Sequence, residues 1–110
     1  MKTQIGFSLL LTFVLSAATF ANEVSSLPQV KKITNGQPEE VAEFVERTVV
    51  CDHWAGEESY DKERAQQIRK AIKNARCGSL AYEEQVLKLK YKQNYTTLDA
   101  IRVWTHNLIQ

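Results

Sequence analysis

The sequence predicts an all-α protein, a small bundle of about four helices with one disulfide between Cys51 and Cys77. Apolar residues recur at spacings of three and four in four separate stretches, which is the period of a helix with one buried face. No segment shows an alternating strand pattern of comparable strength. Both cysteines follow an export signal, and an oxidising compartment favours pairing them.

Residues 1–21 have the features of a cleavable signal peptide. Lys2 supplies a positive charge, the run from Ile5 to Leu15 is mainly apolar, and small residues precede a cleavage site after Ala21. The apolar run is shorter than the ~20 residues that cross a bilayer. We therefore expect cleavage near Ala21 and a mature protein outside the cytoplasm, without stable membrane insertion.

The size and charge of the mature chain limit its function. Removal of residues 1–21 leaves 89 residues, enough for one domain with a modest core. Lys2 leaves with the signal, so 13 basic and 13 acidic residues remain. This balance gives no electrostatic reason to expect binding to nucleic acid or to an anionic membrane.

Residues 22–36 are expected to be a flexible lead-in to a single helical domain of residues 37–110. Ser25, Pro28 and Gly36 lie in the lead-in, which has no periodic apolar pattern. Two of its apolar residues could still pack on the domain, namely Val30 and Ile33.

The first helix of the domain is expected from about Pro38 to Val50. Proline is tolerated in the first turn, and Glu39 and Glu40 suit a helix N-terminus. The predicted core face consists of Val41, Phe44, Val45, Thr48 and Val49.

The second helix is expected from Asp61, a good N-cap, to Cys77. Gly78 can adopt the left-handed conformation that often ends a helix. The predicted inward stripe consists of Ala65, Ile68, Ile72 and Ala75.

Two further helices follow. Ser79 is the expected cap of a third helix from about Leu80 to Tyr91, and Thr96 with Asp99 approximates a capping box for the last helix. The residues of the third helix that are expected to face the core are Tyr82, Val86, Leu89 and also Leu87. In the last helix the predicted face is Leu98, Ile101, Thr105 and Leu108, flanked by Trp104.

The disulfide constrains the segment between the first two helices. Cys51 would end one helix and Cys77 the other, so residues 52–60 would have to run back along the second helix, unless one helix ends earlier than the pattern indicates. A helix from Asp61 to Cys77 is about 25 Å long, and nine extended residues span about 30 Å. We therefore expect a rigid connection.

The segment Cys51-x-His53-Trp54-x-Gly56-Glu57-Glu58-x-Tyr60-Asp61-x-x-Arg64, followed by Cys77, resembles a group of small exported proteins of Gram-negative bacteria that have no established activity. The likeness covers residues 51–77. In those proteins a proline often precedes the tyrosine, where this chain has Ser59. The resemblance implies an exported helical domain with a paired cysteine.

This segment provides the candidate binding surface, because a rigid connection with polar and aromatic side chains can form a site. Its residues are His53, Trp54, Glu57, Glu58, Tyr60, Asp61 and Arg64. The competing interpretation is structural. The carboxylates would cap the second helix and pair with Arg64 or Lys62, and Trp54 would pack beside the disulfide.

A metal site and a catalytic site are the other interpretations of the segment. Cys51, His53 and Cys77, with Glu57 or Glu58, could ligate zinc, but their spacing matches no standard site and export favours oxidised thiols. We therefore expect neither a metal nor another cofactor. Adjacent Glu57 and Glu58 point in different directions in an extended stretch and cannot by adjacency alone flank one bond, so we assign no catalytic residue.

The expected function is that of a periplasmic or secreted, non-enzymatic binding protein with an unknown protein partner in the periplasm. A specific form is an immunity or inhibitor protein that blocks a periplasmic hydrolase, by analogy of size and compartment. The alternative is a small cell-wall hydrolase that uses His53 with Glu57 or Glu58.

Overall fold

The computed structural model describes residues 23–107, and side chains as far as residue 103; this part of the chain forms helices and no strand. The elements are α2 (Pro28–Thr34), α3 (Glu39–Ala55), α4 (Lys62–Asn74), a 3₁₀ turn η1 (Cys77–Ser79), α5 (Leu80–Lys90) and α6 (Tyr95–Asn107). Cys51 and Cys77 form a disulfide. The predicted all-α class with one disulfide is therefore confirmed. Predictions for the signal peptide and for three C-terminal side chains lie outside the described residues: Trp104, Thr105 and Leu108.

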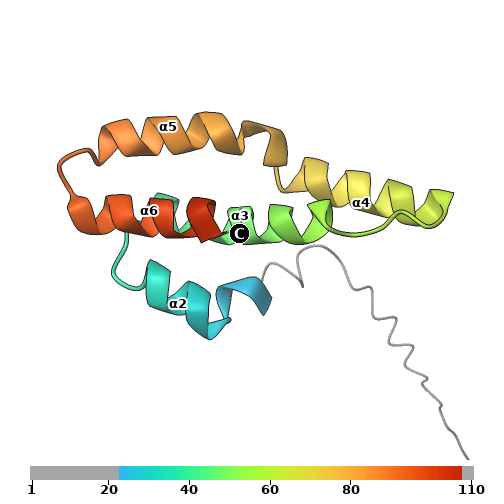
Figure 1. The fold of residues 1–110 in the computed structure, drawn as a ribbon, viewed down its shortest axis with the longest axis horizontal. Helices are drawn as coiled ribbons and strands as arrows, with labels where there is room; N and C mark the ends of the chain where they lie inside the picture. The colour runs from blue at the N-terminus through green and yellow to red at the C-terminus, as the bar shows by residue number, and fades with distance from the viewer. Residues whose placement is uncertain (1–22, 108–110) are drawn as a thin grey trace, which may run out of the picture.

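Helix α3 is the centre of the fold, and it contacts α2, α4, α5 and α6. In the view of Figure 1, α3 and α6 lie at the same level, with α5 on one side of them and α2 on the other, and α4 lies beyond the C-terminal end of α3. The described residues contain no helix that is long and apolar enough to cross a membrane.

The N-terminal half of α3 packs against α5 and α6. Four of the five predicted face residues are buried, and the fifth, Val49, is half-buried. The cluster consists of Val41, Phe44, Val45, Leu87, Ala100 and Ile101. Burying a large apolar side chain stabilises a fold by about 1.5–3 kcal/mol, so this cluster is a main source of stability.

The C-terminal half of α3 forms a second core with α4 and with the start of the described chain. Val50 and Trp54 of α3 pack with Ile68 and Ala71 of α4. Val24 and Val30 complete this cluster, and both are fully buried. The expectation of a flexible lead-in is therefore wrong for this part of the chain: residues 28–34 form α2, whose Pro28 lies in the first turn. Val24, Leu27, Val30 and Ile33 recur every three residues, but the serines, Pro28 and Gly36 among them were interpreted as signs of a flexible segment.

Helix α3 is longer than predicted, because it continues past Val50 to Ala55. Cys51 and Trp54 extend its buried face, and the N–H of Gly56 donates to carbonyls of the last turn. The expectation that residues 52–60 run back along the second helix is therefore wrong for residues 52–55, which are helical. Only residues 56–61 connect α3 to α4.

Helix α4 begins as predicted and ends early. The Asp61 carboxylate accepts a hydrogen bond of 2.7 Å from the Arg64 N–H, the expected N-cap. The helix ends at Asn74 instead of Cys77, and the left-handed residue is Arg76, with φ of 55°, instead of Gly78. Of the predicted stripe, Ile68 is buried, and Ala65, Ile72 and Ala75 are half-buried.

Helix α5 has a different inward face from the predicted one. Leu87 is buried and Leu80 packs against the core, as does Tyr91 just after the helix. Tyr82, Val86 and Leu89 are exposed, so their predicted inward orientation is wrong. Two apolar stripes overlap in this helix, and the period alone could not tell which of them faces α3.

Helix α6 is capped two residues earlier than predicted. The side chain of Asn94 accepts a hydrogen bond from the N–H of Thr97, so Asn94 caps the helix in place of Thr96. Leu98 and Ile101 are buried, as predicted.

Candidate functional site

The seven predicted site residues gather at the corner between α3 and α4, which we call the α3–α4 corner. His53 and Trp54 lie in the last turn of α3, and Glu57, Glu58 and Tyr60 lie in the connection. Asp61 caps α4 and Arg64 lies in its first turn. The seven therefore divide into residues that hold the corner together and residues that it exposes.

Arg64 is the centre of the corner. Its guanidinium carbon lies 5.3 Å from the centre of the Trp54 ring, an arrangement that favours a cation–π contact. Its Nη2 donates to Glu57 at 2.9 Å and its Nη1 to Gln67 at 2.7 Å. The side chain is 20% exposed, so these contacts are partly shielded from water. Arg64 thus joins the connection and α4 to the end of α3.

Glu57 is contacted from two sides. Its second carboxylate oxygen lies 3.2 Å from Nε2 of His53, four residues earlier. The His53 ring in turn meets the Trp54 ring edge to face, with centroids 5.3 Å apart. In the structure Asp61 caps α4 and Glu57 pairs with Arg64, as the structural interpretation expects, and Trp54 lies in the second core.

The exposed residues of the predicted surface are His53, Glu58, Tyr60 and Asp61. Tyr60 is 77% exposed, comparable with Tyr82 and Tyr95 elsewhere in the chain. A small hollow of about 320 Å³ lies beside it, lined also by Asp61, Glu63, Arg64 and Gln67. Glu58 and Tyr60 can contact a partner without disturbing the contacts of Arg64, whereas His53 is itself paired with Glu57.

The same geometry bears on the metal and hydrolase interpretations. Both thiols are joined in the disulfide, so neither is available as a thiolate ligand. Within the described part of the chain, no group of three or more His, Cys, Asp or Glu side chains is arranged to hold a metal ion. Glu57 is held by Arg64, and its neighbour Glu58 is exposed on the connection.

A second polar cluster, which the sequence did not reveal, lies at the C-terminal end of α4. Arg47 of α3 pairs with Glu83 of α5 through both carboxylate oxygens, at 2.6 and 3.0 Å. Arg47 also donates to the carbonyls of Ala75 and Arg76, and its side chain is only 12% exposed. The bonds from Arg47 and from the Ser79 hydroxyl lower the pKa of Glu83 to about 2. The only feature of the sequence that could have indicated this cluster is the position of Arg47 on the half-buried side of α3.

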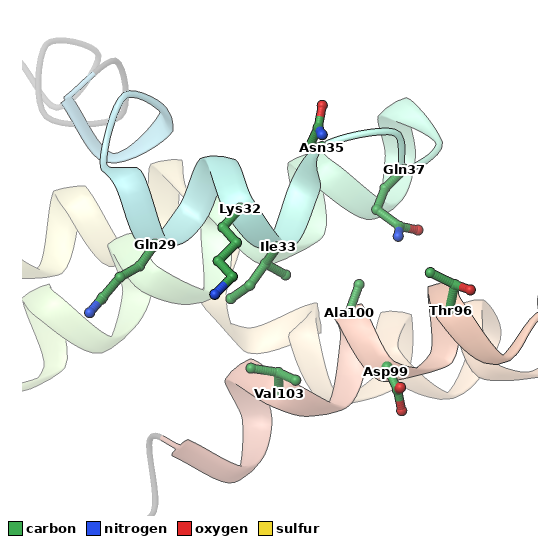
Figure 2. Close-up of a pocket in the computed structure, with 9 residues that line it drawn as sticks. All are labelled: Gln29, Lys32, Ile33, Asn35, Gln37, Thr96, Asp99, Ala100 and Val103. Atoms are coloured by element: carbon green, nitrogen blue, oxygen red, sulfur yellow. The ribbon is translucent and has the colours of Figure 1, made fainter.

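A hollow of about 670 Å³ lies between α2 and α6 (Figure 2). Lys32 and Ile33 of α2 extend toward α6, where Ala100 and Val103 lie opposite them. Its rim includes Gln29, Asn35, Gln37, Thr96 and Asp99. Sequence reasoning missed this hollow, because α2 was expected to be flexible.

Comparison with known proteins assigns neither a family nor a function to this chain. No family model matches this chain. No curated protein and no solved structure is significantly similar to it. Any function must therefore be argued from the residues and their geometry.

Proposed function

We propose that this protein is exported to the periplasm and acts there as a non-enzymatic binding protein, with the exposed side of the α3–α4 corner as its contact surface. One observation carries the proposal: Arg64 ties together Trp54 and Glu57, and it lines the same hollow as Tyr60, which is 77% exposed. Aromatic side chains on a rigid support give large contact area at low entropic cost.

The resemblance of residues 51–77 to small exported proteins of Gram-negative bacteria supports the compartment, as does the disulfide, which is stable in oxidising surroundings. In its specific form the proposal is an immunity or inhibitor protein that blocks a periplasmic hydrolase. Such a protein needs a stable surface and no catalytic group, which agrees with the internal pairing of Glu57.

The test is crosslinking of the tagged protein in intact cells followed by capture from the periplasm. We compare the wild type with a triple variant that carries His53→Ala, Glu58→Ala and Tyr60→Ala. The matched control replaces three exposed residues of α4: Gln66, Arg69 and Lys70. All variants must keep the helical circular dichroism spectrum.

A partner that is lost in the corner variant and kept in the control variant supports the proposal. Capture that is the same for all three proteins contradicts the placement of the surface. Hydrolysis of purified peptidoglycan that Glu57→Gln abolishes contradicts the non-enzymatic assignment.

A further inference from the structure

Helix α4 and the turn after it carry a local excess of positive charge, although the charges of the mature chain balance. Residues 64–82 include five basic residues and no acidic one. Two of the five are neutralised, because Arg64 pairs with Glu57 and Arg76 pairs with Glu43. The other three are exposed and form no ion pair within the described part of the chain: Arg69, Lys70 and Lys73. The overall balance of charge therefore does not describe this part of the surface.

A hollow of about 680 Å³ lies beside these cations, where α4 passes into η1. All of its charged lining residues are basic, and its apolar lining includes the half-buried side chain of Ile72. A concave surface with charge of one sign concentrates ions of the opposite sign. We call this site the basic hollow, and its lining includes Arg69, Ile72, Lys73, Arg76, Cys77 and Gly78.

The surroundings leave the basic hollow open. The inner side of α4 packs against α3 through Ile68 and Ala71, and Figure 1 shows α4 extending away from α5 and α6. At Gly78 an added Cβ would meet no atom within 4 Å, so this wall of the hollow faces open space. A ligand can therefore reach the cations without any rearrangement of the helices.

The extent of the charge narrows the class of ligand. The three unpaired cations lie within five consecutive residues of α4, about 6 Å along the helix axis. Proteins that bind nucleic acid neutralise phosphates along a longer track, commonly about six to ten of them. A compact group of cations beside an apolar wall suits a single anionic group attached to aliphatic carbon, which is the chemistry of a phospholipid headgroup.

We infer that the basic hollow binds the headgroup of an anionic phospholipid and thereby holds the protein at a membrane surface. The phosphate oxygens accept hydrogen bonds from Arg69 and Lys73, and the aliphatic carbons of the headgroup lie against Ile72. Lys70 attracts neighbouring lipids. The α3–α4 corner, at the opposite end of α4, stays free, so the inference does not depend on the function proposed for the corner.

The number of unpaired cations sets the expected strength. One basic side chain near an anionic membrane strengthens binding about fivefold. Three of them predict a preference of roughly a hundredfold for anionic over zwitterionic vesicles. Salt screens this attraction, since the Debye length falls from about 10 Å at 0.1 M to about 3 Å at 1 M, so the preference should decrease steeply with salt.

The first test is sedimentation of the purified protein with vesicles of phosphatidylglycerol or of phosphatidylcholine. The double variant with Arg69→Gln and Lys73→Gln should bind phosphatidylglycerol at least about tenfold more weakly than the wild type. The matched control, with Lys31→Gln and Lys32→Gln, removes the same charge from exposed positions of α2 and should bind like the wild type. A wild type without preference for phosphatidylglycerol, or equal losses in the two variants, overturns the inference.

A second test identifies the group that is bound. The amide signal of Gly78, which lines the basic hollow, is followed by nuclear magnetic resonance while ligands are added. We expect it to shift with short-chain phosphatidylglycerol below its micelle concentration and to stay unchanged with the matching phosphatidylcholine. Glycerol phosphate, polyglutamate or a DNA oligonucleotide that binds at least as tightly as the lipid overturns the lipid assignment, as does a Gly78 signal that the anionic lipid leaves unchanged.

Discussion

The guanidinium of Arg64 lies over the ring of Trp54, 5.3 Å from its centre, and at the same time pairs with Glu57. A half-buried cation is thus balanced by a carboxylate and an aromatic face. This contact makes the α3–α4 corner a rigid unit. Because it is local, it can be tested apart from the rest of the fold.

Replacing Arg64 with lysine should weaken the corner although the charge is kept. Lysine cannot provide the planar fork that reaches Glu57 and Gln67 while covering Trp54. We expect a loss of about 1–2 kcal/mol in the free energy of unfolding by urea. Arg69→Lys, at an exposed position one turn further along α4, is the control and should change stability by less than about 0.5 kcal/mol. Equal effects of the two substitutions would refute the role of Arg64.

The ion pair between Arg47 and Glu83 should stabilise the fold more than the exposed ion pair between Arg76 and Glu43 does. Glu83→Gln removes a charge from a partner that is 12% exposed, so we expect a loss of about 2 kcal/mol in the free energy of unfolding. Glu43→Gln acts on a pair whose two side chains are more than half exposed, and should cost less than about 1 kcal/mol. The reverse order would contradict this ranking.

Acid should remove the contribution of the Glu83 carboxylate to the free energy of unfolding. Its pKa is lowered from 4.5 to about 2 in the folded protein. A lowered pKa means that the carboxylate stabilises the fold above pH 4.5 and loses this effect as the pH falls toward 2. The stability difference between wild type and Glu83→Gln should therefore shrink between pH 4.5 and 2 in urea titrations. A difference that stays constant over this range would show that the charge of Glu83 is not its source.

The disulfide should stabilise the fold by constraining the unfolded chain. The cysteines are separated by 26 positions, for which the loop-entropy relation gives about 3–4 kcal/mol. We expect the double variant with Cys51→Ala and Cys77→Ala to lose about this much in urea unfolding. Dithiothreitol should destabilise the wild type by a similar amount and leave the double variant unchanged. A wild type that is insensitive to the reductant, with its thiols shown to be free, would contradict this prediction.

Helix α2 should be part of the folded unit. Val30 is fully buried in the second core, so Val30→Ala should cost about 1–2 kcal/mol in the free energy of unfolding. Val103→Ala makes the same chemical change at an exposed position and should cost less than about 0.5 kcal/mol. If both substitutions were neutral, the packing of α2 on α3 would be in doubt.

The features that could be predicted from the sequence depend mostly on residues that lie close together along the chain. The core face of α3 follows from strict helical spacing, and the Asp61 cap follows from one side chain and the next turn. The disulfide followed from the cysteine count and the export signal. The sequence could not predict which stripe of α5 faces the core, because that depends on how α5 lies against α3.

Long-range contacts limited the prediction of the candidate site. Arg47 and Glu83 are 36 residues apart, and no local pattern links them. The serines, Pro28 and Gly36 around Val24 and Val30 were interpreted as a flexible segment, so α2 and the hollow beside it were missed. The residues predicted as a surface meet at the α3–α4 corner, but the sequence could not separate Trp54 and Arg64, which hold the corner, from Tyr60, which it exposes.

The central claim, that the α3–α4 corner binds a partner protein, is tested most directly by photo-crosslinking in intact cells. A benzophenone amino acid is placed at Tyr60, and, as a control, at the exposed Lys70 of α4. We predict a discrete protein adduct after irradiation from position 60 and none from position 70. No adduct from position 60, or the same adducts from both positions, would contradict the claim.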